Sequence, residues 1–178
     1  RLSLVGSEMC IRDRIMMNDM AHAVLRLLEE NKIDYTLAEH PAVFNMEELY
    51  AQGLEHCDAI AKNLLVRDQK KRFYWLLVLY GEKRADLKTL KAQLGHGALS
   101  FAGAEELAEL LGLTPGSVTP FGALNDKEHR VTLLLDEDYR GKLIGVHPND
   151  NTATVWLPAD ALVELLRQQG TTVEFIPF

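Results

Sequence analysis

Hydrophobic and polar positions along this chain follow two periods, one helical and one of strands. Apolar residues recur at helical spacing from Met20 to Leu28, after a capping Asn18 or Asp19. A capping-box pattern at Asn45 and Glu48 predicts a second helix over Met46–Leu54. Three further helices are predicted where a Pro or a small or polar residue opens an apolar run and a Gly closes it: Asp86–Leu94, Ala104–Leu111 and Pro158–Gln168.

Shorter runs rich in β-branched and aromatic residues predict the strands. Phe73–Tyr80 is almost wholly apolar, which is typical of a strand covered on both faces. Together with Ala59–Val66 and the charged residues between them, it predicts a central hairpin. The remaining predicted strands are Tyr35–Glu39, Leu99–Phe101, Arg130–Leu135, Leu143–Val146, Thr152–Leu157 and Thr172–Ile176. Hairpins beside helix crossovers predict a single α/β domain of the α+β type, with a mixed, mostly antiparallel sheet flanked by helices.

One stretch, Leu113–Gly122, follows neither period. It contains two Pro, two Gly, two Thr and one Ser, which is typical of an ordered, turn-rich loop. Such a loop exposes main-chain N–H groups, and Gly lets a ligand approach the backbone closely. We interpret the loop as one that holds a carbonyl oxygen. The alternative is a plain connection between a helix and a strand.

The first fifteen residues do not resemble part of the domain. Residues 3–14 resemble the translation of a sequencing adapter, whereas the apolar run is too short and interrupted for a signal peptide. We therefore expect a non-native leader over 1–15 and the domain over 16–178, with a native start at Met16, Met17 or Met20.

Composition narrows the class of protein. Of 178 residues, 47% are apolar and 25% are charged, as in an ordinary soluble domain. Cys10 and Cys57 match no metal or redox spacing, and no apolar run approaches the length of a membrane span. We expect a cytoplasmic protein without disulfides.

The net charge of −7 argues against indiscriminate nucleic-acid binding. Between Lys62 and Lys91, however, nine basic residues stand against three acidic ones. This basic strip either docks phosphates or is the solvated tip of the predicted hairpin.

Sequence motifs do not support nucleophilic or metal catalysis. The chain has no G-x-S-x-G, P-loop, G-x-G-x-x-G or H-E-x-x-H motif. His56 and Cys57 are adjacent, and neighbouring side chains point apart on a helix or strand. We therefore expect neither a cysteine nucleophile nor a bound metal.

Three other positions suggest chemistry. Lys62 and Asn63 interrupt an apolar run, so they either face a cleft or lie on a solvated edge strand. His147 ends a strand before Pro148, so it lies at a sheet rim, where it either shuttles a proton or bonds the turn backbone. His40, before Pro41, is a candidate pocket wall.

Together these stretches resemble the prolyl-tRNA editing family, the bacterial YbaK/ProX-type aminoacyl-tRNA deacylases. The matching pieces occur in order from about Asn18 to Phe178, and they are Glu39–Pro41, Ala61–Asp68, Ser100–Ala102, Leu110–Gly122, Asn125–Asp126, His147–Asn149 and Asn151–Thr152. The resemblance is strongest to the free-standing members that remove alanine mischarged onto proline tRNA. It implies a partly barrel-like sheet and hydrolysis of an aminoacyl-tRNA ester.

The resemblance also implies a role for each matching residue. Lys62 would engage the terminal adenosine or its phosphate, with Asn63 beside the aminoacyl group. The backbone at Gly116 and Ser117 would hold the ester carbonyl, and His147 would fix the terminal ribose or the attacking water. The positions expected to contact the substrate as well are His40, Thr119, Phe121 and Asn151. No metal, cofactor or covalent intermediate is implied.

The expected partners are the acceptor end of an aminoacylated tRNA and, as a candidate, prolyl-tRNA synthetase, with no membrane; the oligomeric state stays open. Asn45 stands where a Thr is expected, and Asp150 where an apolar residue is usual, so the amino acid removed is less certain than the reaction. The alternatives to an alanyl-tRNA(Pro) deacylase are a cysteinyl-tRNA(Pro) deacylase and a tRNA- or synthetase-binding module without turnover.

Overall fold

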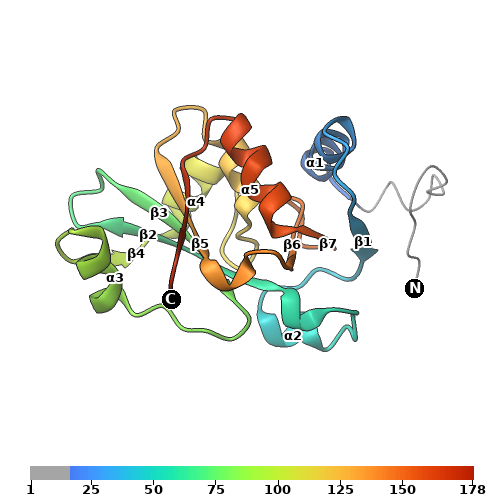
Figure 1. Cartoon of the computed structure of the whole chain (residues 1–178), viewed down its shortest axis with the longest axis horizontal. Coiled ribbons are helices and arrows are strands. Elements are labelled where there is room, and N and C mark those ends of the chain that lie inside the picture. Colours follow the sequence, from blue (N-terminus) through green and yellow to red (C-terminus); the bar gives the residue numbers. More distant parts are fainter. Residues whose placement is uncertain (1–16) are drawn as a thin grey trace.

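The predicted central hairpin organises the larger of two sheets. In the computed structural model, which describes residues 17–178, β2 (Ala61–Asp68) pairs antiparallel with β3 (Tyr74–Tyr80). β4 (Leu99–Phe101) flanks β2 antiparallel, while β5 (Val131–Asp136) and β8 (Val173–Ile176) continue from β3 in parallel. The sheet order is therefore β4-β2-β3-β5-β8 (Figure 1). The predicted leader, 1–15, lies outside the described residues.

A second, antiparallel sheet holds β1 (Thr36–Glu39), β7 (Ala153–Pro158) and β6 (Leu143–Val146), in that order. A parallel bridge between Ile60 and Gly145 joins the two sheets just before β2 begins. The strands thus form two sheets rather than one, while the mixed, mostly antiparallel pairing and the flanking helices are as predicted.

Most helices begin and end where the sequence predicts. α1 (Asp19–Glu30) is capped by Asn18, and α3 (Leu87–Leu94), α4 (Ala104–Leu111) and α5 (Ala159–Gln168) match their predicted ranges to within a residue. α2 (Met46–Tyr50) ends four residues earlier than predicted, because the chain turns and Gly53 adopts a left-handed φ of 63°. The described residues also form the short 3₁₀ helices η2 (Cys57–Ala59), η3 (Pro120–Asn125) and η4 (Glu137–Tyr139).

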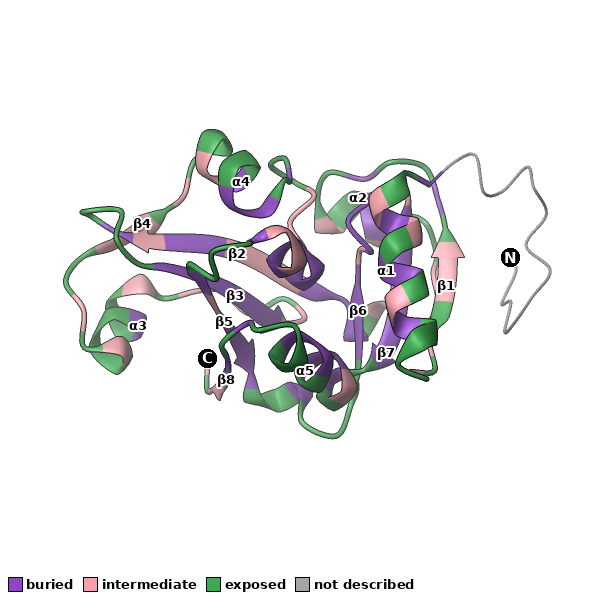
Figure 2. Cartoon of the chain, turned by 90° about the horizontal axis from the view of Figure 1, so that it is seen from above, coloured by how far each residue is buried: buried purple, intermediate pink, exposed green. Residues whose placement is uncertain are grey.

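β3 is buried on both faces, as its apolar run predicts. Tyr74, Leu76 and Val78 belong to the main core, which also holds apolar residues of α1, α4 and α5. Trp75 and Leu77 point the other way and pack with Leu90 of α3. Figure 2 accordingly shows α3 and α4 on opposite sides of the β2–β3 pair.

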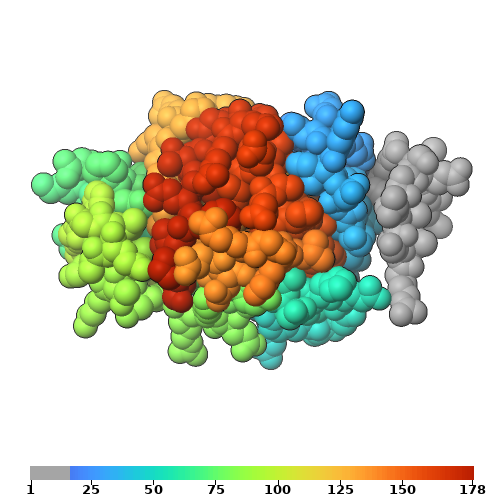
Figure 3. Space-filling model, viewed as in Figure 1, coloured from blue at the N-terminus to red at the C-terminus, as the bar shows by residue number. Residues whose placement is uncertain are grey.

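Elements far apart in the sequence lie next to each other on one face of the molecule. In the space-filling view, α5 and the segment that contains β6 form a continuous face, with α1 beside it (Figure 3). Asp150 links that face to α1, because its carboxylate accepts a hydrogen bond from the main-chain N–H of Asn18 at 2.7 Å. The unusual Asp150 therefore has a structural role. None of the helices within residues 17–178 has the length and apolar character needed to span a bilayer.

Candidate functional site

A cavity of about 390 Å³ opens where the two sheets meet. Its walls come from the β2 residues 61–65, the segment 43–46 before and at the start of α2, the loop at 115–116, and the end of the second sheet at 145–147. Lys62, Asn63, Gly116 and His147 all line this cavity. Folding therefore gathers four of the sequence-predicted residues from three distant segments.

Lys62 is partly buried at the open edge of β2 and is the only lysine or arginine among the described lining residues. Those lining residues include no Asp or Glu. A cation in a largely apolar wall favours an anionic ligand, because the wall screens the charge less than water does. Lys62 thus lies on an edge of β2, as one of the two sequence-based alternatives expected, and it also lines the cavity.

Asn63 lies beside Lys62, with its carboxamide against the strand. Its Nδ2 donates to the main-chain carbonyl of Ala61 at 3.4 Å. Its Oδ1 is buried and has no hydrogen-bond partner among the described residues. A buried acceptor without a donor is unfavourable, so this atom is suited to a donor supplied by a ligand.

Gly116 brings the turn-rich loop against the opposite wall. Its φ is +82°, and a Cβ at this position would lie 2.6 Å from the main-chain oxygen of Phe44. Both the backbone conformation and this close approach require glycine. The loop therefore contacts the wall through its backbone, as expected of a loop that presents main-chain N–H groups.

Ser117 was predicted to hold the ester carbonyl together with Gly116. Its main-chain N–H donates to the carbonyl of Thr114 at 3.1 Å, so it is not available to a substrate carbonyl in this structure. Ser117 is also absent from the cavity lining. Its observed role is to close the turn that presents Gly116.

His147 forms a backbone hydrogen bond, as one of the two alternatives for the sheet rim expected, and it also lines the cavity. Its Nδ1 lies 2.8 Å from the carbonyl of Ala153, which fixes Nδ1 as the protonated donor. Nε2 is then an acceptor on a ring that lines the cavity. Burial lowers the pKa of His147, and the neighbouring His40 ring, 6.0 Å away between centroids, lowers it further. The hydrogen bond to Ala153 opposes this shift only in part, so the ring is neutral near pH 7.

His40 supports the cavity from behind rather than lining it. Its Nδ1 donates to the carbonyl of Pro41, and its Nε2 accepts from the Thr154 hydroxyl, each at 2.9 Å. Burial lowers the pKa of His40, so the ring stays neutral. Because its neutral Nε2 accepts the hydrogen bond, it fixes the orientation of the Thr154 hydroxyl. Thr154 itself lines the cavity and was missed from the sequence. The feature of the sequence that could have indicated Thr154 is a polar residue within an otherwise apolar strand.

Three residues predicted to contact the substrate lie outside the cavity lining in this structure. Phe121 is fully buried in the main core, and Thr119 is fully buried with its hydroxyl donating to the main-chain carbonyl of His147. Asn151 donates from Nδ2 to the carbonyl of Val43 at 3.0 Å, which anchors that wall residue. None of the three is among the residues that line the cavity. Thr119 holds the backbone of His147 and Asn151 that of Val43, and both of those residues line it.

Two aromatic wall residues were not predicted as site residues. Phe44 and Phe101 line the cavity, yet they are 59% and 54% exposed. Asn45 also lines this wall and caps α2 by accepting a hydrogen bond from Glu48 at 2.8 Å. Its replacement of the expected Thr therefore lies where it can affect which amino acid fits.

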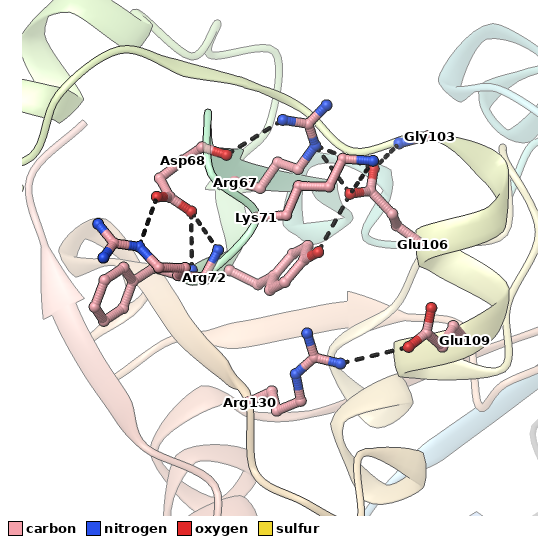
Figure 4. A network of polar contacts seen from close by, with 10 residues as sticks. Arg67, Asp68, Lys71, Arg72, Gly103, Glu106, Glu109 and Arg130 are labelled. Atoms are coloured by element: carbon pink, nitrogen blue, oxygen red, sulfur yellow. Dashed lines mark hydrogen bonds and ion pairs between the residues drawn. The ribbon is translucent and has the colours of Figure 1, made fainter.

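The basic strip is partly neutralised by acidic neighbours. Arg67 lies 2.9 Å and Lys71 3.6 Å from Glu106, at the start of α4 (Figure 4). Arg72 pairs with Asp68, and Lys83 with Asp136 and Asp138. The hairpin tip is therefore an ion-paired surface with less free charge than the residue count indicates.

Within residues 17–178, no group of three or more His, Cys, Asp or Glu side chains is arranged to hold a metal ion. Cys57 donates from Sγ to the carbonyl of Leu54, and burial raises the pKa of its thiol. A raised pKa disfavours the thiolate, so Cys57 is poorly suited to act as a nucleophile.

Comparisons with known proteins agree with the resemblance found in the sequence. Residues 40–165 match the model of the aminoacyl-tRNA editing domain. The prolyl-tRNA editing protein ProX of Acetoanaerobium sticklandii is 42% identical over 159 residues, covering 89% of this chain and 97% of that protein. Prolyl-tRNA synthetase associated domain-containing protein 1 of Xenopus laevis is 31% identical, covering 87% and 95%. A solved structure of a candidate trans-editing enzyme for prolyl tRNA synthetase has a TM-score of 0.67 at 26% identity, covering 91% and 99%.

Proposed function

This chain belongs to the aminoacyl-tRNA editing domain family, and from that membership we propose that it removes alanine from mischarged proline tRNA as a free-standing enzyme. The family's reaction is hydrolysis of the ester between an amino acid and tRNA. The observation that carries the proposal is the cavity onto which Lys62, Asn63, Gly116 and His147 converge.

An aminoacyl ester is already activated, so the protein needs to place a water molecule and stabilise the developing oxyanion. The Gly116 loop would offer a main-chain N–H donor that needs no reorganisation. Lys62 provides the positive charge for a phosphate of the terminal nucleotides. The neutral Nε2 of His147 accepts a proton from the attacking water or the terminal ribose hydroxyl.

Selection by size follows from the wall of the cavity. Val43, Met46 and Leu49 form an apolar side opposite β2. A wall that sterically excludes proline protects the correctly charged tRNA, whereas alanine fits. Steric exclusion discriminates strongly against larger side chains, while a synthetase rejects smaller ones only weakly. The partners we propose are therefore charged proline tRNA and prolyl-tRNA synthetase, in the cytoplasm.

The purified chain is expected to hydrolyse alanyl-tRNA(Pro) and leave prolyl-tRNA(Pro) intact. The measurement is loss of ester over time from proline tRNA charged with Ala, Cys, Ser or Pro, each corrected for spontaneous hydrolysis. Hydrolysis of the cysteinyl ester alone would replace the proposed substrate by cysteine. If tRNA is bound but no ester is lost, the chain is a binding module and the proposal is wrong.

The lowered pKa of His147 predicts how the reaction depends on pH. A neutral ring accepts a proton, and burial keeps the ring neutral below the usual value of 6.5. The acceleration over spontaneous hydrolysis should therefore stay level from pH 8 to 6.5 and fall only below that value. The folded-state pKa is depressed, so the contribution of His147 to stability is present in full above 6.5 and is lost as the pH falls below it. A His147→Gln variant should lose the acid limb of the profile; an unchanged limb would assign it to another group.

A further inference from the structure

The cavity wraps around the free edge of β2. Five consecutive residues of this strand, 61–65, line the cavity. Side chains alternate between the two faces of a strand, so a cavity on one face would contact only every second residue. Contact with all five means that the cavity meets the strand at its edge, where main-chain N–H and C=O groups point outward.

That edge is open only over a short interval. β4 pairs with Val66, Arg67 and Asp68, and the last bond on this side is from the N–H of Ala102 to the carbonyl of Leu65. Before β2, the bridge from Ile60 to Gly145 closes the edge again. Between these two points no described strand pairs with β2 on this side.

The register identifies which residue presents its backbone there. The main-chain groups of alternate residues point to opposite sides of a strand. Asp68 bonds to Phe73 at the β3 side, and Leu65 bonds to Ala102 at the β4 side. Even-numbered residues therefore point to β3, and odd-numbered residues point to the open edge. Asn63 is the odd-numbered residue in the middle of the open interval, so its N–H and C=O both face the cavity.

The side chain of Asn63 agrees with this assignment. Its Nδ2 donates to the carbonyl of Ala61, the preceding odd-numbered residue, and so satisfies that outward group. No such partner from the described residues serves the main chain of Asn63. A donor, an acceptor and the partnerless buried Oδ1 of the same residue thus meet at one point of the cavity wall.

We propose that the aminoacyl group binds here as a one-residue continuation of β4, paired antiparallel with Asn63. An esterified amino acid carries an amine donor and a carbonyl acceptor on either side of its Cα, as a strand residue does. The Asn63 C=O would accept from the amine, and the Asn63 N–H would donate to the ester carbonyl, adding a second donor to that of the Gly116 loop. This inference rests on the proposed function and adds a requirement for an α-hydrogen-bond donor on the substrate.

The same pairing directs the amino-acid side chain. Residues directly opposite each other in an antiparallel pair place their side chains on the same face. The Asn63 face also carries Leu65, which packs in the main core with Leu107, and both residues line the cavity. An L-amino acid would therefore place its side chain on the face of β2 that carries Asn63 and Leu65.

The kinetic test compares three esters of proline tRNA: alanyl, lactyl and propionyl. The lactyl ester keeps a donor as a hydroxyl, whereas the propionyl ester has none. The acceleration over spontaneous hydrolysis should stay within about threefold for lactyl and fall about tenfold for propionyl, the loss expected of one hydrogen bond. Asn63→Ala should keep this ratio because it keeps the main chain. Equal acceleration of all three esters, or loss of the ratio in Asn63→Ala, would overturn the proposal.

Amide hydrogen exchange provides a test without turnover. In the free protein, the N–H of Asn63 should exchange quickly, while that of Leu64, which points to β3, should be protected. Adding 3′-alanylamido-3′-deoxyadenosine should slow exchange at Asn63, and the propionylamido analogue should do so less. Protection of Asn63 in the free protein, or no change with either analogue, would refute the open edge. If the wild type hydrolyses no ester, the proposed function fails, while the exchange in the free protein still decides whether the edge is open.

Discussion

Replacing Lys62 by alanine is expected to lower kcat/KM for alanyl-tRNA(Pro) at least about a hundredfold. Lys62 is the only cationic side chain among the described cavity residues that carries a fixed charge, and the wall around it is mostly apolar. Leaving the phosphate of the substrate without its cation in such a site costs about 2–5 kcal/mol, and each 1.4 kcal/mol is tenfold. Stability should change little, because Lys62 is only partly buried and forms no ion pair with the described residues.

The control is Lys70→Ala. Lys70 is exposed at the tip of the same hairpin, so this variant removes the same charge away from the cavity. It should keep activity within about threefold, apart from a change in the salt dependence of tRNA binding. Both variants should unfold at the urea concentration of the wild type. Full activity in Lys62→Ala would contradict the assigned site, and an equal loss in both variants would assign the effect to long-range attraction of tRNA.

Replacing Gly116 by alanine is the second change with a large expected effect. An alanine there must adopt a φ of +82° and place its Cβ 2.6 Å from the main-chain oxygen of Phe44. The left-handed conformation alone costs about 1–3 kcal/mol. Since the contact is with backbone, a side-chain rotation cannot relieve it, and the loop must move away from the wall. We expect a loss of at least about tenfold in kcat along with lower stability.

Gly141→Ala separates these two causes. Gly141 has a similar φ of +70°, but a Cβ added there would meet nothing within 4 Å. This variant should show the conformational cost in urea unfolding and keep the activity of its folded fraction. Loss of kcat in Gly116→Ala beyond that in Gly141→Ala therefore measures displacement of the loop from the cavity. Equal kcat in the two variants would mean that the loop does not hold the reacting ester.

Local patterns were sufficient where neighbouring residues decide the structure. Asn18 and Asp86 cap the N-termini of α1 and α3, and Gly112 caps the C-terminus of α4, as predicted. These positions could be predicted because a cap acts over only three or four residues. α2 was predicted too long, since its apolar residues continue past Tyr50 while the chain turns toward Gly53. The division into two sheets was not visible, because a strand's sequence does not record its partner.

For the candidate site, too, local patterns indicated some residues and not others. Lys62, Asn63, Gly116 and His147 stand out in the sequence because polar residues or glycine interrupt a regular pattern, and all four line the cavity. Ser117, Thr119, Phe121 and Asn151 share those motifs but serve the loop, the core or the wall. Proximity in sequence did not distinguish a residue that faces the cavity from one that supports it. Phe101 and Thr154 were missed as site residues because an aromatic or a threonine in a strand is ordinary there. Phe44 was missed because it lies in the loop before α2, outside any periodic pattern.

By itself, the sequence determined most helix ends, the buried central hairpin and the family, because caps, periods and ordered motifs are properties of neighbouring residues. Only the tertiary structure decided which main-chain groups are left without partners. On this edge β4 stops at Phe101, and the Ile60–Gly145 bridge lies before β2 begins, so the edge of β2 is open between them at Asn63. Such an opening depends on where three separate segments end, and no single stretch of the chain contains that information.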